Sequence, residues 1–423
     1  MATSHRKYII LTIIVVLAVA LFIWISQRWS VWFADHPEPQ FAMADCPQCV
    51  QLTTDTTSKS RIVSWRTSTS VLWQTLVWVN CAVNDTIKTT AHYSTITSGG
   101  GAAVYYYASM SVLPNCQYSY WIESAMGDTT AHFYTKTPYE GSAKLLIIGD
   151  IQDKQYSGTD TIVRSIVALH KPDYIIQLGD LIERPHQAYW ERYFSDFLSV
   201  ATTIPTAAVV GNHDYHKGIN PYPDIRTFYT FPYYLSSVND VKYQECNDID
   251  ALKRHDLTGC TALDYGKVRV VFIDTKLQFF RQFSQRRRVK QLLGATRPDK
   301  YLIVAMHHAP HSSVSKFNNL IVRWLYAPII NCSNVSIVYA AHEHNTLIST
   351  PKDLGTTYYQ SVQNFSAKDY TKAHGTHGRH YTILTTTTTE PISTATNAIT
   401  RDTLTSITYT INHTPIDTIQ IIR

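Results

Sequence analysis

Charged residues are scarce in this sequence. Asp, Glu, Lys and Arg make up 16% of its 423 residues, whereas soluble domains average about 25%. The formal net charge is only +5, from 37 basic and 32 acidic residues, and so mild a balance does not favour nucleic acid as a partner. Hydrophobic residues reach 44%, which excludes a disordered or collagen-like chain and allows two or three domains with sizeable cores.

Cysteine is also sparse. Seven cysteines are far too few for a disulfide scaffold, and their odd number leaves at least one thiol unpaired within the monomer. The Cys46–Cys49 pair has no second close pair to complete a zinc ribbon. In an oxidising compartment, Cys81–Cys116 and Cys246–Cys260 are candidate bridges, although the sequence alone does not establish the connectivity.

The first thirty residues contain an apolar run without charge, at positions 8–26. At 1.5 Å per residue this run is roughly 28 Å long, enough to cross a bilayer core of about 30 Å. Arg6 and Lys7 precede it, and a short basic N-terminal segment favours an N-terminus on the inside. We therefore predict a transmembrane anchor over residues 1–30, with the rest of the chain extracytoplasmic, in a periplasm, on a cell surface or in a secretory lumen.

Two other interpretations of the apolar run are open. A cleaved signal peptide usually has an apolar region of about 7 to 15 residues followed by small residues, and residues 24–28 (WISQR) are a poor cleavage context. A buried core helix would need packing partners, and nothing upstream could supply them. The uncleaved anchor is therefore favoured. Residues 31–50 follow with three prolines and are typical of a juxtamembrane linker.

Residues 51–140 alternate apolar and polar side chains without a helical period. Strand candidates lie at 61–67, 75–79 and 118–122, separated by turn signals such as Gly99–Gly101. The pattern predicts a small β-sandwich with Trp65 in its core. Leu113-Pro114 followed by Tyr118 resembles the corner tyrosine of fibronectin-type sandwiches. We see no cluster of ionisable residues in this region, which favours a structural or interaction role.

From residue 141 to 423 the pattern is that of an α/β domain. Apolar strands are predicted at 145–148, 174–178, 207–210, 268–273, 301–305 and 335–340, and amphipathic helices at 159–170 and 188–198. A tyrosine-rich insertion at 219–263 is expected to form a lid or rim over the site that these strands build. The threonine-rich tail, in which Ile, Leu and Tyr interleave, is expected to add further strands.

Polar side chains follow five of the predicted strands, where open α/β sheets place their ligands. They are Asp150, Asp180, Asn212-His213-Asp214, His307-His308 and His342-Glu343-His344. Any one of these could be a turn or a surface loop, but chance does not readily explain five, each at a strand end. Oxygen and imidazole ligands in this number suit two borderline-hard divalent or trivalent ions rather than a cysteine-rich structural zinc site.

These motifs resemble those of the calcineurin-like metallophosphoesterases. The resemblance covers roughly residues 144–345, through Gly149-Asp150-Ile151-Gln152, Gly179-Asp180, Gly211-Asn212-His213-Asp214, His307-His308-Ala309-Pro310 and Ala341-His342-Glu343-His344. The preceding β-sandwich is similar to the arrangement in purple acid phosphatases. The resemblance implies a four-layer α/β sandwich and a two-metal centre of Fe, Zn or Mn.

By matching position, the resemblance also implies roles for individual residues. The metal ligands would be Asp150, Gln152 and His344 for the first ion, Asp180 as the bridge, and Asn212, His307 and His342 for the second. His213 would lie beside the leaving-group oxygen, oriented by Asp214. Gln152 replaces the histidine of most relatives, and Glu183 replaces the tyrosine that colours purple acid phosphatases. A purple Fe(III) centre is therefore not expected.

The predicted function is metal-dependent hydrolysis of small phosphate monoesters outside the membrane. Two cations roughly 3.5–4 Å apart lower the pKa of a shared water and clamp the phosphoryl oxygens. The same ions serve diester bonds, so a phosphodiesterase acting on nucleotides or lipid headgroups is an alternative. A non-catalytic surface module is another, with a metal site degenerate through Gln152 and Glu183. The partners expected are a small phosphate-ester substrate and the membrane, through the N-terminal helix.

Overall fold

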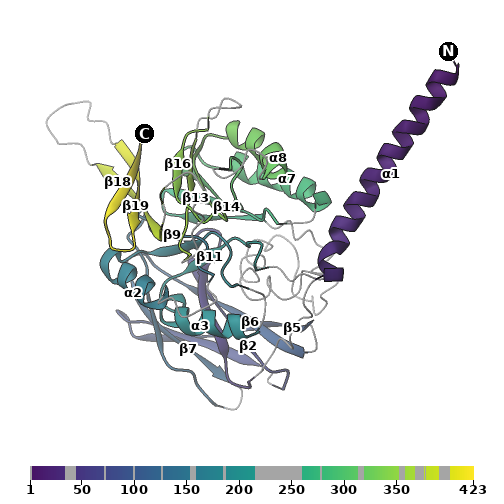
Figure 1. Ribbon diagram of the computed structural model, residues 1–423. Helices are drawn as coiled ribbons and strands as arrows, with labels where there is room; N and C mark the ends of the chain where they lie inside the picture. Colours follow the sequence, from purple (N-terminus) through teal and green to yellow (C-terminus); the bar gives the residue numbers. More distant parts are fainter. Residues whose placement is uncertain are drawn as a thin grey trace.

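The structure is a computed structural model that describes residues 2–33, 44–70, 73–98, 101–124, 127–152, 159–183, 187–214, 260–276, 279–312, 319–351, 358–366, 376, 378–389 and 401–423. Figure 1 shows a long N-terminal helix, a β-sandwich and an α/β body. This is the predicted succession of an apolar helix, an all-β region and an α/β region.

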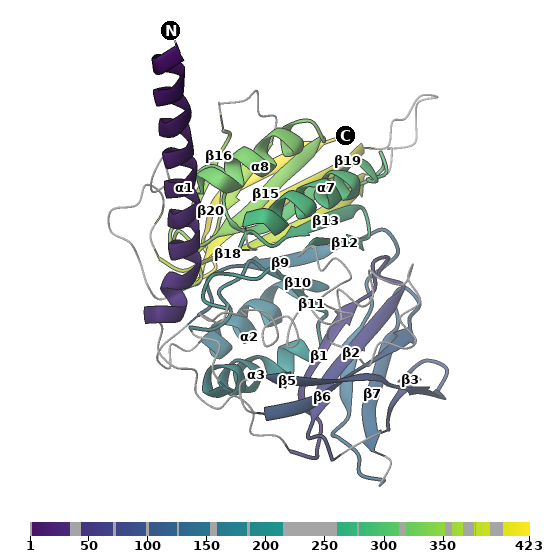
Figure 2. The ribbon, with the colours of Figure 1, turned by 90° about the vertical axis from the view of Figure 1, so that its right-hand side faces the viewer.

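The N-terminal helix α1 (Ala2–Phe33) projects away from the rest of the protein (Figures 1 and 2). Its segment Tyr8–Ser26 is long and apolar enough to cross a membrane, and none of that segment is buried in the protein. A core helix buries its apolar side chains against neighbours, so the interpretation of this run as a core helix is wrong. A membrane anchor and a signal sequence both fit the exposed helix.

The all-β region consists of two four-stranded antiparallel sheets. One has the order β1 (Gln48–Thr54), β2 (Ser60–Thr67), β6 (Gly101–Ser111) and β5 (His92–Ser98), and the other β4 (Asp85–Thr90), β3 (Gln74–Asn80), β7 (Gln117–Ser124) and β8 (Phe133–Lys136). Side chains alternate between the faces of each strand, so each sheet contributes one apolar face to a shared core.

The core of this sandwich is built around Trp65. The indole is 2% exposed and stacks on Tyr106, with ring centroids 5.5 Å apart, as its predicted core position requires. The Tyr118 hydroxyl accepts a hydrogen bond of 2.8 Å from the backbone N–H of Leu113, so the expected corner tyrosine is present. The assignment of the sandwich to the fibronectin type III class stays a prediction.

The predicted Cys81–Cys116 bridge is wrong, because both residues carry free thiols in the structure. The backbone N–H of Cys81 donates to the carbonyl of Gln117 at 2.9 Å. Cys116 is therefore one residue out of register with Cys81, and successive side chains of a strand point to opposite faces. Cys246, the predicted partner of Cys260, lies outside the described residues.

The α/β body contains two six-stranded sheets. The first has the order β11 (Thr206–Ala208), β10 (Tyr174–Gln177), β9 (Lys144–Ile148), β18 (His380–Thr389), β19 (Arg401–Thr410) and β20 (Pro415–Ile422). The second has the order β12 (Cys260–Tyr265), β13 (Val268–Ile273), β14 (Tyr301–His308), β15 (Val335–Ala341), β17 (Tyr359–Val362) and β16 (Leu347–Ser349). The tail strands β18–β20 are antiparallel and extend the first sheet.

The two sheets pack face to face and helices cover their outer faces, which gives the predicted four layers (Figure 2). One apolar cluster joins Leu145 and Ile147 of β9 to Val270 and Ile303 of the second sheet. Helices α2 (Thr159–His170) and α3 (Gln187–Ala201) contribute to the cluster on the outer side of the first sheet, and α7 (Phe279–Gly294) and α8 (Leu320–Asn331) to that of the second. Strands covered on both faces read as continuous apolar runs.

The β-sandwich packs directly on the α/β body. Tyr105 of β6 belongs to the same apolar cluster as Phe194 of α3. The Tyr120 hydroxyl donates to the carbonyl of Thr202 at 2.6 Å, and the fully buried Arg61 guanidinium lies over the ring of Tyr174, 5.3 Å from its centroid. The sandwich therefore packs against α3 and the first sheet, and is more than a domain joined by a linker.

The predicted lid at 219–263 lies almost wholly outside the described residues, which resume at Cys260.

Candidate metal centre

The polar motifs meet where the parallel strands of the two packed sheets end. Asp150 follows β9, Asp180 follows β10, Asn212 follows β11 and His342 follows β15. β9–β11 are parallel to one another, as are β13–β15 and β17, so their carboxyl ends share one edge of each sheet. His307 differs from the expectation, because β14 continues through it to His308 instead of ending before it.

Four of the motif residues have a left-handed backbone conformation although none is glycine. The φ angles are 56° at Asp150, 50° at Asp180, 73° at His342 and 48° at His344. A non-glycine residue in this region costs of order 1–3 kcal/mol, and such residues cluster at functional sites. The same sharp turn after each strand directs these side chains back toward the strand ends.

Glycines make room for these turns. Gly179, with φ 88°, lies so close to the next motifs that an added Cβ would approach His307 Nδ1 to 2.7 Å. An added Cβ at Gly211 would overlap the carboxylate and amide of Asp180. Glycine is therefore required at 179 and 211 because the loops after β10 and β11 approach each other closely. This requirement is separate from the preference of glycine for turns.

Asp180 occupies the middle of the site. Its Oδ1 accepts the backbone N–H of His213 at 2.8 Å, and its Oδ2 lies 3.3 Å from His307 Nε2. Ligand atoms of Asp150, Asp180 and His344 all lie within 4.8 Å of one another, and all three residues are buried. Asp150 is held in place by a backbone hydrogen bond, because its Oδ1 accepts the N–H of His342 at 3.0 Å.

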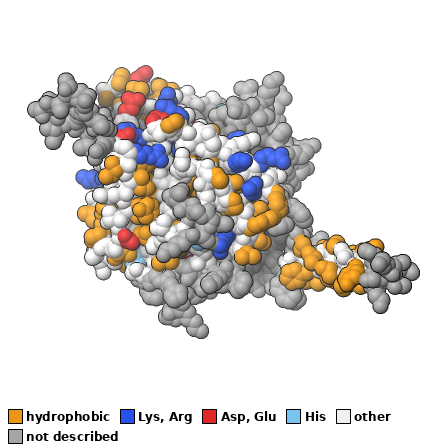
Figure 3. All heavy atoms as spheres, turned by 90° about the horizontal axis from the view of Figure 1, so that it is seen from above, with side chains coloured by type: hydrophobic (Ala, Val, Ile, Leu, Met, Phe, Trp, Pro, Cys, Tyr) orange, Lys and Arg blue, Asp and Glu red, His pale blue; other side chains and the backbone are white. Residues whose placement is uncertain are grey.

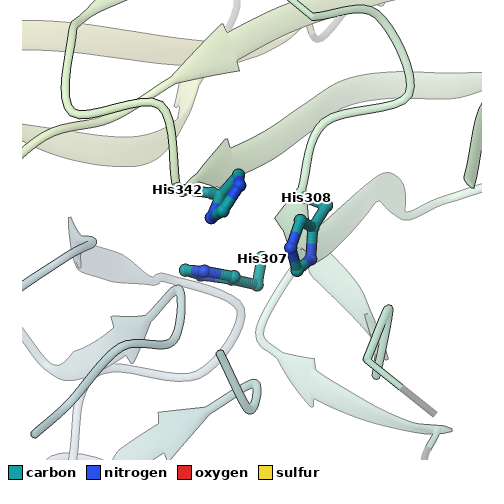
Figure 4. A group of neighbouring side chains, drawn as sticks. All are labelled: His307, His308 and His342. Carbon is teal, nitrogen blue, oxygen red and sulfur yellow. The ribbon is translucent and has the colours of Figure 1, made fainter. Parts of the chain in front are cut away.

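A second group consists of three imidazoles, shown in Figure 4. Ring nitrogens of His307, His308 and His342 lie within 4.8 Å of one another. His307 Nδ1–H donates to the carbonyl of Leu178 at 2.8 Å, which leaves Nε2 facing the Asn212 side-chain oxygen at 3.1 Å. A backbone acceptor for one ring nitrogen is the usual device that aims the other nitrogen at a metal.

The donor set fits a cation. With Nδ1 protonated, neutral His307 presents a lone pair at Nε2, and the nearest partners of that atom are oxygens of Asn212 and Asp180. Such an arrangement of acceptors is stabilised by a proton or a metal between them. Among the described residues, the buried Asp150 Oδ2 and Gln152 Oε1 also lack a hydrogen-bond partner. A buried polar atom without a partner costs about 1–3 kcal/mol, which a bound cation would remove.

The structure brings together all seven residues proposed as metal ligands. Gln152 is 1% exposed, and its Nε2 lies 3.3 Å from His344 Nε2, so it has the position expected of the missing histidine. Its unpartnered carbonyl oxygen is the atom that could bind a metal. The substitution therefore retains a donor at this position, although a neutral and weaker one.

Electrostatics in the site follow from burial and from the closeness of the acids to His307. Burial raises the pKa of Asp150 to about 8, against the opposing charge of His307. Burial alone would also raise the pKa of Asp180, but the charge and hydrogen bond of His307, together with those of His213, outweigh it and lower this pKa to about 2. Burial alone would lower the pKa of His307, whereas the two carboxylates raise it to about 9. The carboxylates of Asp150 and Asp180 are thus stabilised by a positive charge beside them, which His307 supplies when it is protonated and a bound cation could also supply.

His213 and Asp214 differ in what they contact. His213 is half-buried, and its Nδ1–H donates to the carbonyl of Glu183 at 2.9 Å. The Asp214 carboxylate accepts the backbone N–H groups of Leu181 at 2.7 Å and Gly211 at 2.8 Å. The expectation that Asp214 orients His213 is therefore wrong, because the Glu183 carbonyl does so. Asp214 instead ties the loops after β10 and β11 together.

Thr275 was not singled out from the sequence as a site residue. It follows β13, is 5% exposed, and its hydroxyl lies 2.8 Å from Nδ1 of His308. The signal that could have found it is its position: Asp274-Thr275 follows a buried parallel strand, as the other motifs do. Because threonine is common in this chain, only the contact with His308 distinguishes Thr275 from other threonines.

Two facing sheets with carboxylates, an amide and imidazoles at their strand ends define the class of metallophosphoesterases. Residues 143–346 match the family model of the calcineurin-like phosphoesterases, so this part of the chain is a calcineurin-like phosphoesterase domain.

A solved structure shows the same fold. A purple acid phosphatase from yellow lupin (Lupinus luteus) seeds is 15% identical with a TM-score of 0.67, and the match covers 90% of this chain and 75% of that one. GAP50, described as the anchor in the inner membrane complex of Plasmodium, is 11% identical with a TM-score of 0.43, over 66% of this chain and 88% of that one. A search of the curated proteins found no match.

Proposed function

We propose that this chain is a phosphomonoesterase that uses two metal ions of Fe, Zn or Mn. The observation that carries the proposal is the buried set of acceptors around Asp180, in which His307 Nε2 and the Asn212 oxygen lie 3.1 Å apart. Such a set is costly without positive charge between its members. Structural packing alone would favour apolar side chains at these strand ends, as in the strands that lead to them.

Individual residues have distinct parts in the proposed activity. Asp150, Gln152 and His344 would hold one cation, and Asn212, His307 and His342 the other, with Asp180 between them. When bound, such ions activate a water and neutralise charge on the phosphoryl group. The protein contributes rigid placement, since the left-handed turns and the His307–Leu178 hydrogen bond hold the side chains before any ion arrives.

His213 is the proposed general acid. Its Nδ1 hydrogen is engaged by the Glu183 carbonyl, so Nε2 is the ring nitrogen that can pass a proton to the departing alkoxide. Its backbone N–H is bonded to Asp180, which keeps the residue beside the proposed ions. A protonated imidazole can act as a general acid near neutral pH.

A decayed, non-catalytic site is the less favoured proposal. Loss of metal binding removes the need for buried acceptors, and unpartnered oxygens such as Asp150 Oδ2 would then only destabilise the fold. Diester hydrolysis is the alternative enzymatic activity, because the same ions could serve both bonds and the shape of the substrate would decide between them.

We further propose that α1 is retained as a membrane anchor and that the phosphoesterase domain lies outside the cytoplasm. The supports are the fully exposed apolar segment Tyr8–Ser26 and the basic Arg6-Lys7 before it. Added protease should remove the domain from intact cells if it lies on the cell surface, from spheroplasts if it is periplasmic, and from sealed microsomes only after detergent if it is lumenal. A chain that starts after residue 26 in the mature protein would instead identify a cleaved signal sequence.

The full chain, purified in detergent, provides the test of activity. It should be stripped with a chelator and reloaded with Zn²⁺, Mn²⁺ or Fe, and bound metal should be counted by mass spectrometry. Phosphomonoesters and phosphodiesters should then be compared as substrates at matched leaving groups. We expect close to two ions per chain and a higher kcat/KM for monoesters. Fewer than one ion per chain and no turnover would support the non-catalytic module, and higher kcat/KM for diesters would support a phosphodiesterase.

A further inference from the structure

His308 faces the same space as the proposed metal ligands His307 and His342. Consecutive residues of a strand normally point to opposite faces, but the register of β14 against β15 shifts between Ala305 and His308. The ring centroids of His307 and His308 are consequently only 4.8 Å apart, and that of His308 is 4.2 Å from His342 (Figure 4). Proximity alone would make His308 a third imidazole ligand.

The hydrogen bonds of His308 point to a different chemistry. The Thr275 Oγ1 accepts the backbone N–H of His308 at 3.1 Å and lies 2.8 Å from its Nδ1. A buried hydroxyl also needs an acceptor for its own hydrogen. Among the residues that the structure describes, the acceptor offered to Thr275 is Nδ1 of His308. The hydroxyl therefore donates to Nδ1, and a ring whose Nδ1 accepts carries its hydrogen on Nε2.

The two adjacent histidines therefore carry opposite groups at Nε2, on rings that lie around one space (Figure 4). In His307 the Nδ1–H donates to Leu178, and Nε2 keeps the lone pair that a metal ligand needs. In His308 the hydrogen is on Nε2, so this atom can donate but cannot ligate. A fixed N–H donor beside two cations suits an anionic oxygen, since preorganised donors stabilise negative charge on a reacting group.

We propose that His308 donates a hydrogen bond to a phosphoryl oxygen of the substrate and is not a metal ligand, with Thr275 as its positioning residue. This proposal rests on the proposed phosphoesterase function. It adds a specificity element. A phosphate monoester has three non-bridging oxygens and a diester has two, so a donor placed beside the metal ions has one more acceptor available in a monoester.

The tautomer is measured directly by NMR on the full chain in detergent, labelled with 15N-histidine. The His308 resonances are identified by their loss in the His308→Leu variant. We expect the Nε2–H tautomer in the unsubstituted chain. The isosteric Thr275→Val variant removes the hydroxyl donor and should abolish this preference. An Nδ1–H tautomer in the unsubstituted chain would overturn the proposal.

Binding measurements distinguish a donor from a ligand. In His308→Leu, the Zn²⁺ content and the Zn²⁺ affinity in competition with a chelator should stay within about twofold. The affinity for inorganic phosphate should fall about tenfold, and kcat about 10- to 100-fold. His308→Gln, which keeps an amide donor, should recover part of both losses. A loss of one bound ion in His308→Leu would show that His308 is a ligand.

The matched control is His132→Leu, which removes an exposed histidine of the β-sandwich and should change none of these values. The comparison also separates the two proposals. If the unsubstituted chain hydrolyses no phosphoester, the proposed function fails, while the tautomer and the zinc titration still decide the chemistry of His308.

Discussion

Gly149 leaves open the space that the side chain of Ala341 fills. A Cβ added at Gly149 would lie 2.6 Å from the Cβ of Ala341, well inside van der Waals contact. These residues directly precede Asp150 and His342, which are joined by a hydrogen bond of 3.0 Å from the His342 backbone N–H to the Asp150 carboxylate. The motif that carries alanine in place of the expected glycine is thus accommodated by a glycine on the facing strand end.

The first prediction tests this pairing. Gly149→Ala should displace Asp150 relative to His342, weaken metal binding and lower the melting temperature by several degrees, since overpacking of a core costs about 1–3 kcal/mol. Adding Ala341→Gly should restore most of the metal binding and part of the stability, and Ala341→Gly alone should cost about 1 kcal/mol, since glycine in a strand is destabilising and a buried methyl group is lost. Calorimetry and metal content measure the cycle. If the double variant is no better than Gly149→Ala, the clash with Ala341 is not the cause.

The second prediction concerns Asp180. Asp180→Asn keeps the shape of the side chain and removes the negative charge from between the two proposed ions. Both ions should bind more weakly, and turnover should fall by several orders of magnitude. Metal counting and steady-state kinetics on the same preparation test this. Normal turnover with a full metal complement would remove Asp180 from the bridging position.

The third prediction separates acid catalysis from metal binding. His213→Ala should retain both ions and lose about 10²- to 10⁴-fold in kcat on alkyl phosphates, the range typical of general acid help. The loss should be much smaller on nitrophenyl phosphate, because nitrophenolate departs without a proton. Equal losses on both substrates would mean that His213 orients phosphate rather than protonating the leaving group.

The fourth prediction is a pH dependence of the metal-free chain. The folded pKa values of Asp150 and His307 are raised to about 8 and about 9, from ordinary values of 3.8 and 6.5. Between pH 6.5 and 9 the folded state therefore binds more protons than the unfolded state, so stability falls as pH rises. The pKa of Asp214, which burial raises to about 7, adds to this slope. The pKa values of His342 and His311 are lowered by burial to about 3 and about 4, so these residues oppose the slope, but only near pH 6.5, where the unfolded histidines still hold protons.

Melting temperatures of chelator-treated protein at pH 6.5 and 8.5 test this sign. We expect a lower value at pH 8.5, and a recovery on adding Zn²⁺, because the metal replaces the protons held by the site and stabilises the folded state by mass action. A melting temperature that rises with pH in the metal-free chain would contradict the assigned cluster.

Much of the architecture could be predicted because its signals are local. Strands were expected at 145–148 and 268–273 from mostly apolar runs. The first is observed one residue longer, as Lys144–Ile148, and the second with the same bounds. Such runs can be recognised in the sequence because both faces of these strands are covered, so most of their positions are apolar. The apolar helix at the N-terminus could also be predicted, since a long run without charge indicates a helix that is long and apolar enough to cross a membrane.

The site was predictable at the level of residue type and order. Asp150 and His344 are nearly two hundred positions apart, yet each stands at a strand end where parallel sheets collect their ligands. Contacts that depend on fine placement could not be read in this way. The orientation of His213 by a backbone carbonyl of Glu183 leaves no trace in side-chain identity, and Asp214 was consequently given the wrong partner.

The sequence by itself determined which helices and strands form and which types of ligand residue follow the strands. Both depend on local patterns, the hydrophobic periodicity and the order of the motifs. Tertiary structure alone decided how those ligands differ from one another. His307 and His308 are identical side chains in adjacent positions, but a register shift in β14 brings both into one space. Their Nδ1 atoms have different distant partners, the Leu178 carbonyl and the Thr275 hydroxyl, and from these partners we infer opposite tautomers. Hydrogen-bond partners 129 and 33 residues away are set by packing of the two sheets, which no local pattern specifies.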